Sequence, residues 1–208
     1  MFDNIRKFFG LYIASDFPCV MSSGNKKIAK NVKIFNLPAI DSCPNHSLCG
    51  KSCYAKRSEK RFPKVRNARM RNFSLAKWHR RLLKKIILRD LQAGDIVRVH
   101  ESGDFFNEPY INMWYEIALE RGDCKFYAYT KNQNFPFESF RYLMNFNVIN
   151  SILPDGSMNF GKENVVRDKA ILFNADICPC RKGQADQKIC MSLCKTCLSA
   201  QRVVFVAH

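Results

Sequence analysis

The chain has 208 residues, a formal net charge of +16 and 47% hydrophobic residues. This length suits one large domain or two small ones, and the apolar content excludes a disordered chain. The excess of positive charge indicates a polyanionic partner, with nucleic acid or a nucleotide as the first candidate. The sequence has no apolar run of the ~18 residues that span a membrane, and Asp3 interrupts its start. We therefore expect a cytoplasmic protein with no signal peptide and no membrane partner.

The first predicted strand lies in the apolar stretch 32–40 and leads directly into CPNHSLCGKSCYA, residues 43–55. In a cytoplasmic protein, thiols this close together are typical of metal or cluster binding rather than of disulfides or core packing. The three cysteines, Cys43, Cys49 and Cys53, have the spacing C-x5-C-x3-C. They could bind zinc with His46 as the fourth ligand, or hold an iron–sulfur cluster with one iron open to a substrate or cofactor.

A basic stretch follows, from Lys64 to Arg89, and it contains no Asp or Glu. Its apolar residues recur at steps of three and four, which predicts an amphipathic helix with one packed face and one positive face. Such a face could simply be solvated, but the mutual repulsion of its charges favours a bound anion. We expect phosphate contacts from Arg69, Arg71, Lys77, Arg80, Arg81, Lys84 and Lys85.

The segment DIVRVHESGDFF, residues 95–106, indicates a buried strand that runs into a polar loop. His100, Glu101 and Asp104 in this loop are candidates for a catalytic acid, a base or metal ligands. The competing interpretation is a loop whose polar groups only cap the helix that follows.

The remaining elements alternate between helix and strand. We expect a helix over 108–121, a strand over 125–132, a helix over 137–146, and strands over 147–153, 169–174 and 203–208. This order predicts an α/β fold with a mostly parallel sheet, in which residues just after the strands carry the chemistry.

A second group of cysteines lies in CPCRKGQADQKICMSLCKTC, with the spacing C-x-C-x9-C-x3-C-x2-C. Its members are Cys178, Cys180, Cys190, Cys194 and Cys197. This spacing strongly indicates a second metal site. Ligand type alone allows either zinc or a second iron–sulfur cluster.

The chain resembles the phage gene product 88 family. The resemblance lies in five segments in this order: CPNHSLCGKSCYA, RVHESGDFFN, FYAYTKN, the late cysteines and VFVAH. The same order is similar to a shortened radical S-adenosylmethionine barrel of the branch that includes spore photoproduct lyase. The resemblance implies a partial (β/α) barrel over residues 1–175, with a cysteine-rich segment and a final strand, 176–208, packed on the same domain. The first cysteine spacing and the SGD loop differ from the C-x3-C-x2-C and GGE patterns of that superfamily.

The resemblance also implies roles for particular residues. Cys43, Cys49 and Cys53 would hold a [4Fe-4S] cluster, and Ser102, Gly103 and Asp104 would contact the methionine part of S-adenosylmethionine. Thr130 and Asn132 would line the same site. The expected function is an iron–sulfur, radical S-adenosylmethionine-like enzyme acting on nucleic acid or a nucleotide, in the host cytoplasm if a phage encodes it.

Two other functions remain open from the sequence. One is a zinc-stabilised nucleic-acid-binding protein without redox chemistry, in which the cysteines hold the fold together. The other is a metal-dependent nuclease that uses His100, Glu101 and Asp104.

Overall fold

The computed structural model describes residues 13–25, 28–132, 134–135, 137–161, 163–178 and 194–206. Its larger sheet has five strands in the order of the chain, and all neighbours are parallel except the first pair. These strands are β1 (Met21–Ser23), β2 (Val32–Phe35), β3 (Ile96–Val99), β4 (Lys125–Thr130) and β5 (Phe146–Asn150). The mixed α/β class with a mostly parallel sheet, as expected from the sequence, is therefore confirmed.

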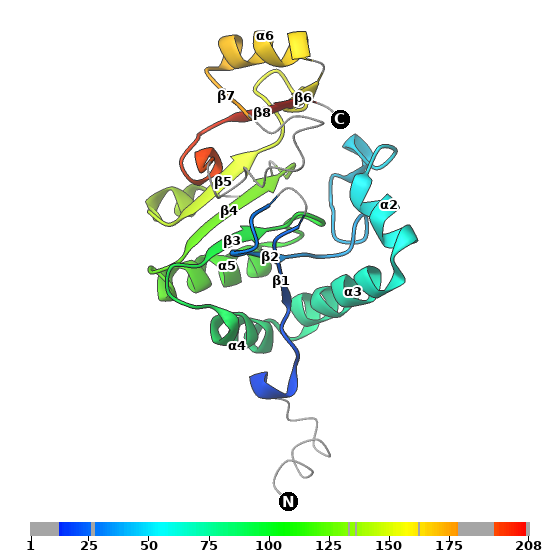
Figure 1. The fold of residues 1–208 in the computed structure, drawn as a ribbon, viewed down its shortest axis with the longest axis vertical. Helices are drawn as coiled ribbons and strands as arrows, with labels where there is room; N and C mark the ends of the chain where they lie inside the picture. Colours follow the sequence, from blue (N-terminus) through cyan, green and yellow to red (C-terminus); the bar gives the residue numbers. More distant parts are fainter. Residues whose placement is uncertain are drawn as a thin grey trace, which may run out of the picture.

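The helices lie in the connections between the parallel strands. They are α2 (Tyr54–Arg61), α3 (Pro63–Trp78), α4 (Arg80–Asp90), α5 (Glu108–Glu120) and the short 3-10 helix η3 (Glu138–Tyr142). Helices α3, α4 and α5 cover one face of the sheet, while α2 stands at its side (Figure 1). The main core lies between them, because alternate strand residues pack there against the helices. Its fully buried members include Phe35, Val97, Val99, Phe126, Leu83, Ile86, Trp114 and Ile117.

The opposite face of the large sheet is more polar and carries sulfur groups. Ile34, Tyr127 and Ile149 pack there with Cys197 and Val203 from the C-terminal part of the chain. Arg98 points to this face as well, since its neighbours Val97 and Val99 belong to the helix-covered core. This second face of the sheet is called the open face below.

A smaller sheet of three parallel strands follows in the chain. Its strands, in spatial order, are β6 (Phe160–Gly161), β8 (Val203–Val206) and β7 (Asp176–Ile177). Helix α6 (Glu163–Phe173) packs Val166 against Leu153 and Val204. The strand expected over 169–174 is therefore wrong, because residues 169–173 form the end of α6 and Asn174 lies in the turn after it. So short an apolar run has no period that separates helix from strand.

Two other expectations need correction. The basic stretch forms two helices rather than one, since His79 leaves the helical region with φ −134° and ψ 44°. The helix expected over 137–146 is only the 3-10 helix η3. Helix α5 is confirmed: Pro109 lies in its first turn, and the Asn107 side chain accepts a hydrogen bond of 2.9 Å from the backbone N–H of Tyr110. Among the described residues, no helix is long and apolar enough to cross a membrane.

Candidate site at the carboxyl ends of the parallel strands

The loops that leave β2 and β3 are joined by backbone and amide hydrogen bonds. The side-chain oxygen of Asn36 accepts from the backbone N–H groups of Glu101 and Ser102, both at 2.8 Å. The backbone N–H of Leu37 donates to the carbonyl of Ser102 at 3.0 Å. The cysteine loop, residues 36–53, therefore begins beside the SGD loop, as parallel strands require.

Gly103 lets these two loops touch. Its φ is +87°, and a Cβ there would lie 2.6 Å from both Leu37 Cβ and Ser42 Oγ. Ser42 is itself fixed, because its hydroxyl donates to the Pro38 carbonyl at 2.6 Å. Glycine at this position is thus required both by backbone conformation and by space.

Asp104 joins the SGD loop to the end of β4. Its carboxylate accepts from Thr130 Oγ1 at 2.7 Å and from the backbone N–H groups of Phe105 and Lys131 at 2.8 and 2.9 Å. Burial raises the pKa of Asp104, and these three donors oppose that rise. Asn132 adds a second link, donating from its side chain to the Phe105 carbonyl at 3.2 Å. Asp104, Thr130 and Asn132, expected to line the site, thus lie together at its floor.

Electrostatic interactions link the thiols of the cysteine loop in pairs, Cys43 with Cys49 and Cys49 with Cys53, and link Cys43 and Cys49 with Asp104. Burial raises the pKa of Cys43 to about 11, and the charges of Asp104 and Cys49 add to the rise while Lys131 opposes it. Burial also raises the pKa of Cys49, with Cys53 and Asp104 adding to it and Lys131 again opposing. Lys131 therefore favours the thiolate forms of Cys43 and Cys49, and a backbone hydrogen bond at Ile40 favours that of Cys43 more strongly. Asn45 holds the loop to β4 by donating to the Lys131 carbonyl at 2.8 Å.

The donor set of the cysteine loop fits a thiophilic metal or an iron–sulfur cluster by type. Within the described parts of the chain, no three His, Cys, Asp or Glu side chains are arranged to hold a metal ion. His46, the possible fourth zinc ligand, has its Nδ1 3.1 Å from the carbonyl oxygen of Cys43. The loop therefore brings suitable donors together without fixing them in a coordinating geometry.

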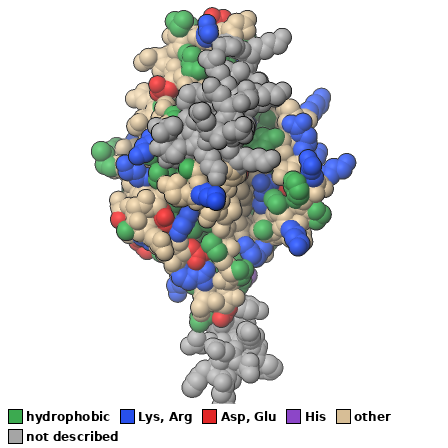
Figure 2. All heavy atoms as spheres, in the orientation of Figure 1, with side chains coloured by type: hydrophobic (Ala, Val, Ile, Leu, Met, Phe, Trp, Pro, Cys, Tyr) green, Lys and Arg blue, Asp and Glu red, His purple; other side chains and the backbone are tan. Residues whose placement is uncertain are grey.

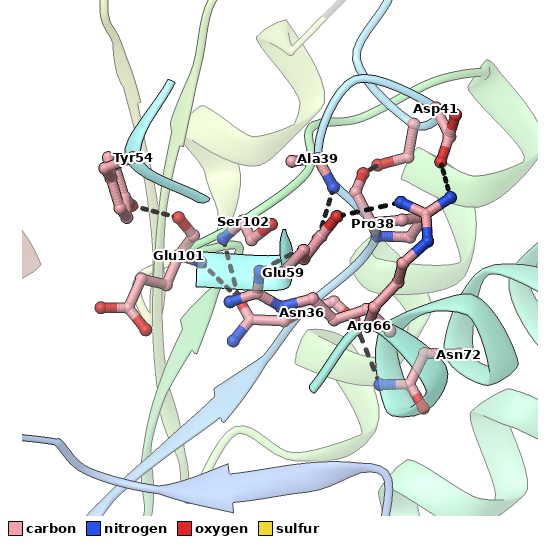
Figure 3. Close-up of polar contacts among 12 residues, drawn as sticks. Asn36, Pro38, Ala39, Asp41, Tyr54, Glu59, Arg66, Asn72, Glu101 and Ser102 are labelled. Carbon is pink, nitrogen blue, oxygen red and sulfur yellow. Dashed lines mark hydrogen bonds and ion pairs between the residues drawn. The ribbon is translucent and has the colours of Figure 1, made fainter. Parts of the chain in front are cut away.

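Glu59, a residue that sequence reasoning missed, anchors the cysteine loop from α2 (Figure 3). This carboxylate is buried and accepts from the backbone N–H of Ala39 at 2.8 Å. It also pairs with the buried Arg69 at 3.0 Å and with Arg66 at 3.4 Å, and Arg66 reaches Asp41 at 3.4 Å. Glu59 and Ala55 lie one helical turn apart on the buried side of α2, an orientation that the sequence did not indicate.

His100 does not face the cysteine loop. Its φ is +69°, and its ring lies among Phe105, Tyr110 and Phe35 in the main core. Its Nε2 shares a hydrogen bond of 2.7 Å with the Tyr110 hydroxyl, and burial lowers the pKa of His100 to about 3. His100, Glu101 and Asp104 do not converge, so the described residues give the nuclease hypothesis no assembled triad.

Glu101 and Arg98 lie on the open face. The Glu101 carboxylate accepts from Asn25 Nδ2 at 2.7 Å, and its carbonyl accepts from the Tyr54 hydroxyl (Figure 3). The Arg98 guanidinium lies 5.8 Å from the centre of the Tyr129 ring. Burial by itself would lower the pKa of Arg98, but Tyr127, Tyr54 and Glu101 raise it overall. Arg98 is thus a fixed cation at the centre of this face.

The described cysteines of the second group also lie on the open face. Cys197 is buried and shares a hydrogen bond of 2.7 Å with the Tyr129 hydroxyl. Cys194 adds to the rise in the pKa of Cys197 that burial causes, and Cys178 packs against the same apolar cluster. Cys180 and Cys190 lie outside the described residues, so the expected five-cysteine site remains a prediction.

The cations of the basic stretch have more partners than their own segment could provide. Arg69 is buried against Glu59, and Lys84 binds Glu116 and Glu120 of α5, each at 2.6 Å. Arg71 donates to the Cys19 carbonyl at 3.3 Å. Lys77, Arg81 and Lys85 are exposed, and Arg80 is half-buried. Part of the basic stretch therefore has a structural role. The sequence did not indicate this role, because the acidic partners lie outside the stretch.

Two residues with strained backbone lie at the edge of the large sheet where the cysteine loop and the SGD loop meet. Among the described residues, three other than glycine have positive φ: Ile40 at 71°, His100 at 69° and Asn174 at 47°. Ile40 lies in the cysteine loop, and His100 directly follows β3. A β-branched residue at positive φ is costly, and such strain is typical of functional loops.

A family model described as "Gene product 88" matches residues 19–171, more than half of the chain. The chain belongs to the gene product 88 family. The match covers the large sheet, the cysteine loop and the SGD loop, and it ends within α6 before the second group of cysteines. Neither the curated proteins nor the solved structures give a match.

Proposed function

We propose that this member of the gene product 88 family is an iron–sulfur enzyme of the radical S-adenosylmethionine type that acts on nucleic acid or a nucleotide. The observation that carries the proposal is the meeting of three loops at one edge of the parallel sheet. The cysteine loop after β2, the SGD loop after β3 and the end of β4 are joined by Asn36, Gly103 and Asp104. In parallel α/β sheets, ligands bind at this edge.

In this proposal, Cys43, Cys49 and Cys53 hold the cluster, which when bound supplies one-electron chemistry. Lys131 favours the thiolate forms of Cys43 and Cys49, since its charge opposes the rise in their pKa values that burial causes. Ser102 offers a buried hydroxyl that has no hydrogen-bond partner among the described residues and lies beside the cysteine loop, a group that could bind a polar part of S-adenosylmethionine. Asp104 and Thr130 orient the loops around it.

The strand order supports a partial barrel as the form of this sheet. Strands β2 to β5 are parallel, each lies beside the one before it in the chain, and helices α3, α4 and α5 cover one face. Neighbouring parallel strands with helices on their outer face are the repeating arrangement of a (β/α) barrel, and a complete barrel takes about 250 residues. We infer that the open face of the large sheet corresponds to the inner side of such a barrel.

A zinc-stabilised nucleic-acid-binding protein is the second candidate. The observation in its favour is the small sheet, in which β6 and β7 have two residues each. Strands this short gain little from pairing and would benefit from a metal held by the neighbouring Cys178, Cys194 and Cys197. In that case the second group of cysteines would be structural, and redox chemistry would be absent.

The deciding experiment is metal and acid-labile sulfide analysis with a visible spectrum on anaerobically purified protein. We expect iron and sulfide at about four or more per chain, and Cys53→Ala should lose about four of each with part of the visible absorbance. Cys19→Ala is the matched control, because Cys19 is exposed and lies outside both cysteine groups. Zinc without sulfide would favour the second candidate. Wild-type iron and sulfide in the Cys53→Ala variant would contradict the ligand assignment.

A further inference from the structure

Helix α2 carries a positive surface that the sequence did not single out. Ala55 and Glu59 face inward, while Lys56, Arg57, Lys60 and Arg61 are exposed. These four side chains are called the α2 cationic face. Figure 2 shows blue side chains gathered on the side of the molecule where α2 lies in Figure 1.

The charges of the α2 cationic face have no ion-pair partner in the described parts of the chain. Lys56 and Lys60 are four residues apart, as are Arg57 and Arg61, so both pairs place like charges side by side on the helix. This arrangement opposes helix formation, and a bound anion would relieve the repulsion.

The helix dipole explains only half of these charges. Lys60 and Arg61 lie in the last turn, where positive charge is favourable. Lys56 and Arg57 lie in the first turn, which has no acidic residue, and positive charge is unfavourable there. The helix dipole therefore disfavours Lys56 and Arg57, and an anion bound near the start of α2 would offset this.

The cations of α3 and α4 differ from those of α2 because some of them form ion pairs. Arg69 is buried with Glu59, and Lys84 binds two carboxylates of α5. Those helices therefore use part of their charge to attach to the protein, whereas the α2 cationic face leaves all of its charge in solvent.

Exposed aromatic rings stand at both ends of α2. Tyr54 at its start is 55% exposed, and Phe62 just after its end is 51% exposed. The Arg61 guanidinium lies 5.4 Å from the centre of the Phe62 ring. Aromatic rings combined with backbone-binding cations are typical of surfaces that bind single-stranded nucleic acid, whose bases are free to stack.

We propose that the α2 cationic face, with Tyr54 and Phe62, is the binding surface for single-stranded nucleic acid. This inference rests on the nucleic-acid partner of the proposed function and names the surface that binds it. Cys53 is the residue immediately before α2, so a strand held on this helix lies next to the cysteine loop. The bound strand would thereby be presented to the edge of the sheet where the three loops meet.

The test compares two variants that each remove two lysines and two arginines. The first is Lys56→Gln, Arg57→Gln, Lys60→Gln and Arg61→Gln combined. The matched control combines Lys77→Gln, Arg80→Gln, Arg81→Gln and Lys85→Gln on α3 and α4. Glutamine keeps good helix propensity, and circular dichroism checks that both variants are folded.

Binding is measured by fluorescence anisotropy with a labelled single strand of about 16 nucleotides, as DNA and as RNA, and with the matching DNA duplex. We expect the α2 variant to bind the single strands at least about tenfold more weakly than the control does. The slope of log affinity against log salt should fall by about 3, since each phosphate contact with a single strand contributes about 0.7. Phe62→Ala should weaken single-strand binding by about tenfold and leave duplex binding unchanged, because only unpaired bases can stack.

Equal losses in the two four-charge variants, or no loss in the α2 variant, would overturn the α2 assignment while nucleic acid remained the partner. Tighter binding of the duplex than of the single strand would overturn the single-strand assignment. A wild-type protein that binds none of the three probes would overturn this inference and the nucleic-acid part of the proposed function together. The iron and sulfide content tests the cluster separately from all of these results.

Discussion

At the scale of single residues, the contact between the cysteine loop and the SGD loop depends on a missing side chain. A methyl group at Gly103 would meet Leu37 and Ser42 at 2.6 Å, and the residue has φ +87°. We predict that Gly103→Ala lowers the free energy of unfolding by about 2 to 4 kcal/mol, through overpacking and backbone strain together. Urea denaturation measures this loss.

Gly94 provides the control for the backbone part of this effect. Its φ is +80°, but nothing lies within 4 Å of the position of an added Cβ. Gly94→Ala should therefore cost only about 1 to 2 kcal/mol, the price of the left-handed conformation. Equal losses at the two glycines would show that the loops are not in tight contact at Gly103.

His100 provides a prediction about pH. Its pKa is about 3 in the folded protein and 6.5 ordinarily, so only the unfolded chain takes up a proton as the pH falls from about 6.5 to about 3. The free energy of unfolding should therefore be highest above pH 6.5 and fall through this window by up to about 1.4 kcal/mol per pH unit. Asn in place of His100 tolerates positive φ and does not titrate.

The measurement is the urea midpoint of the wild type and of His100→Asn at a series of pH values. We expect the variant to be less stable at pH 7, since it loses the ring contacts with Phe105 and Tyr110. Its stability should nevertheless fall less steeply on acidification. The same slope in both proteins would mean that His100 is accessible to protons in the folded state.

At the scale of elements, α2 is attached to α3 and to the cysteine loop through one buried carboxylate. Glu59→Gln keeps the shape of the side chain and an acceptor for the Ala39 N–H, but it leaves the buried guanidinium of Arg69 without a counter-charge. We predict a loss of about 3 to 5 kcal/mol in the free energy of unfolding, as is usual when one partner of a buried pair is removed.

The matched control is Glu116→Gln, which weakens an exposed ion pair with Lys84. Lys84 keeps Glu120 as a partner, so the expected loss is at most about 1 kcal/mol. Thermal or urea unfolding of both variants decides the point. A loss at Glu59 no larger than the loss at Glu116 would show that the buried pair does not anchor α2.

At the scale of the whole molecule, the parallel strands β2 to β5 could be predicted because each is a largely apolar run followed by polar residues, whereas β1, with the sequence MSS, has no such run. The edge where the cysteine loop and Asp104 meet also followed from the sequence, since parallel strands place their carboxyl ends together. Of the small sheet, only the strand expected over 203–208 is found, as β8 (Val203–Val206), because β6 and β7 have two residues each and are too short to show a period.

The parts of the site that the sequence did not reveal depend on which way a side chain points. His100 turns into the aromatic core because its backbone is left-handed, and no local pattern announces that conformation. The role of Glu59 and the solvent exposure of Lys56 and Arg57 depend on the orientation of α2. Helix α2 has eight residues, of which four are cations and two face inward. So short a helix does not show from sequence alone which of its sides is buried.

The strand order of the small sheet has a consequence for synthesis of the protein on the ribosome. Strand β8 is the last strand in the described chain, yet it lies between β6 and β7, and both pair with it. The large sheet and its helices can form as they emerge, because their neighbours follow one another in the chain. The small sheet has no central strand until Val203–Val206 is made, so the two halves of the molecule mature at different times.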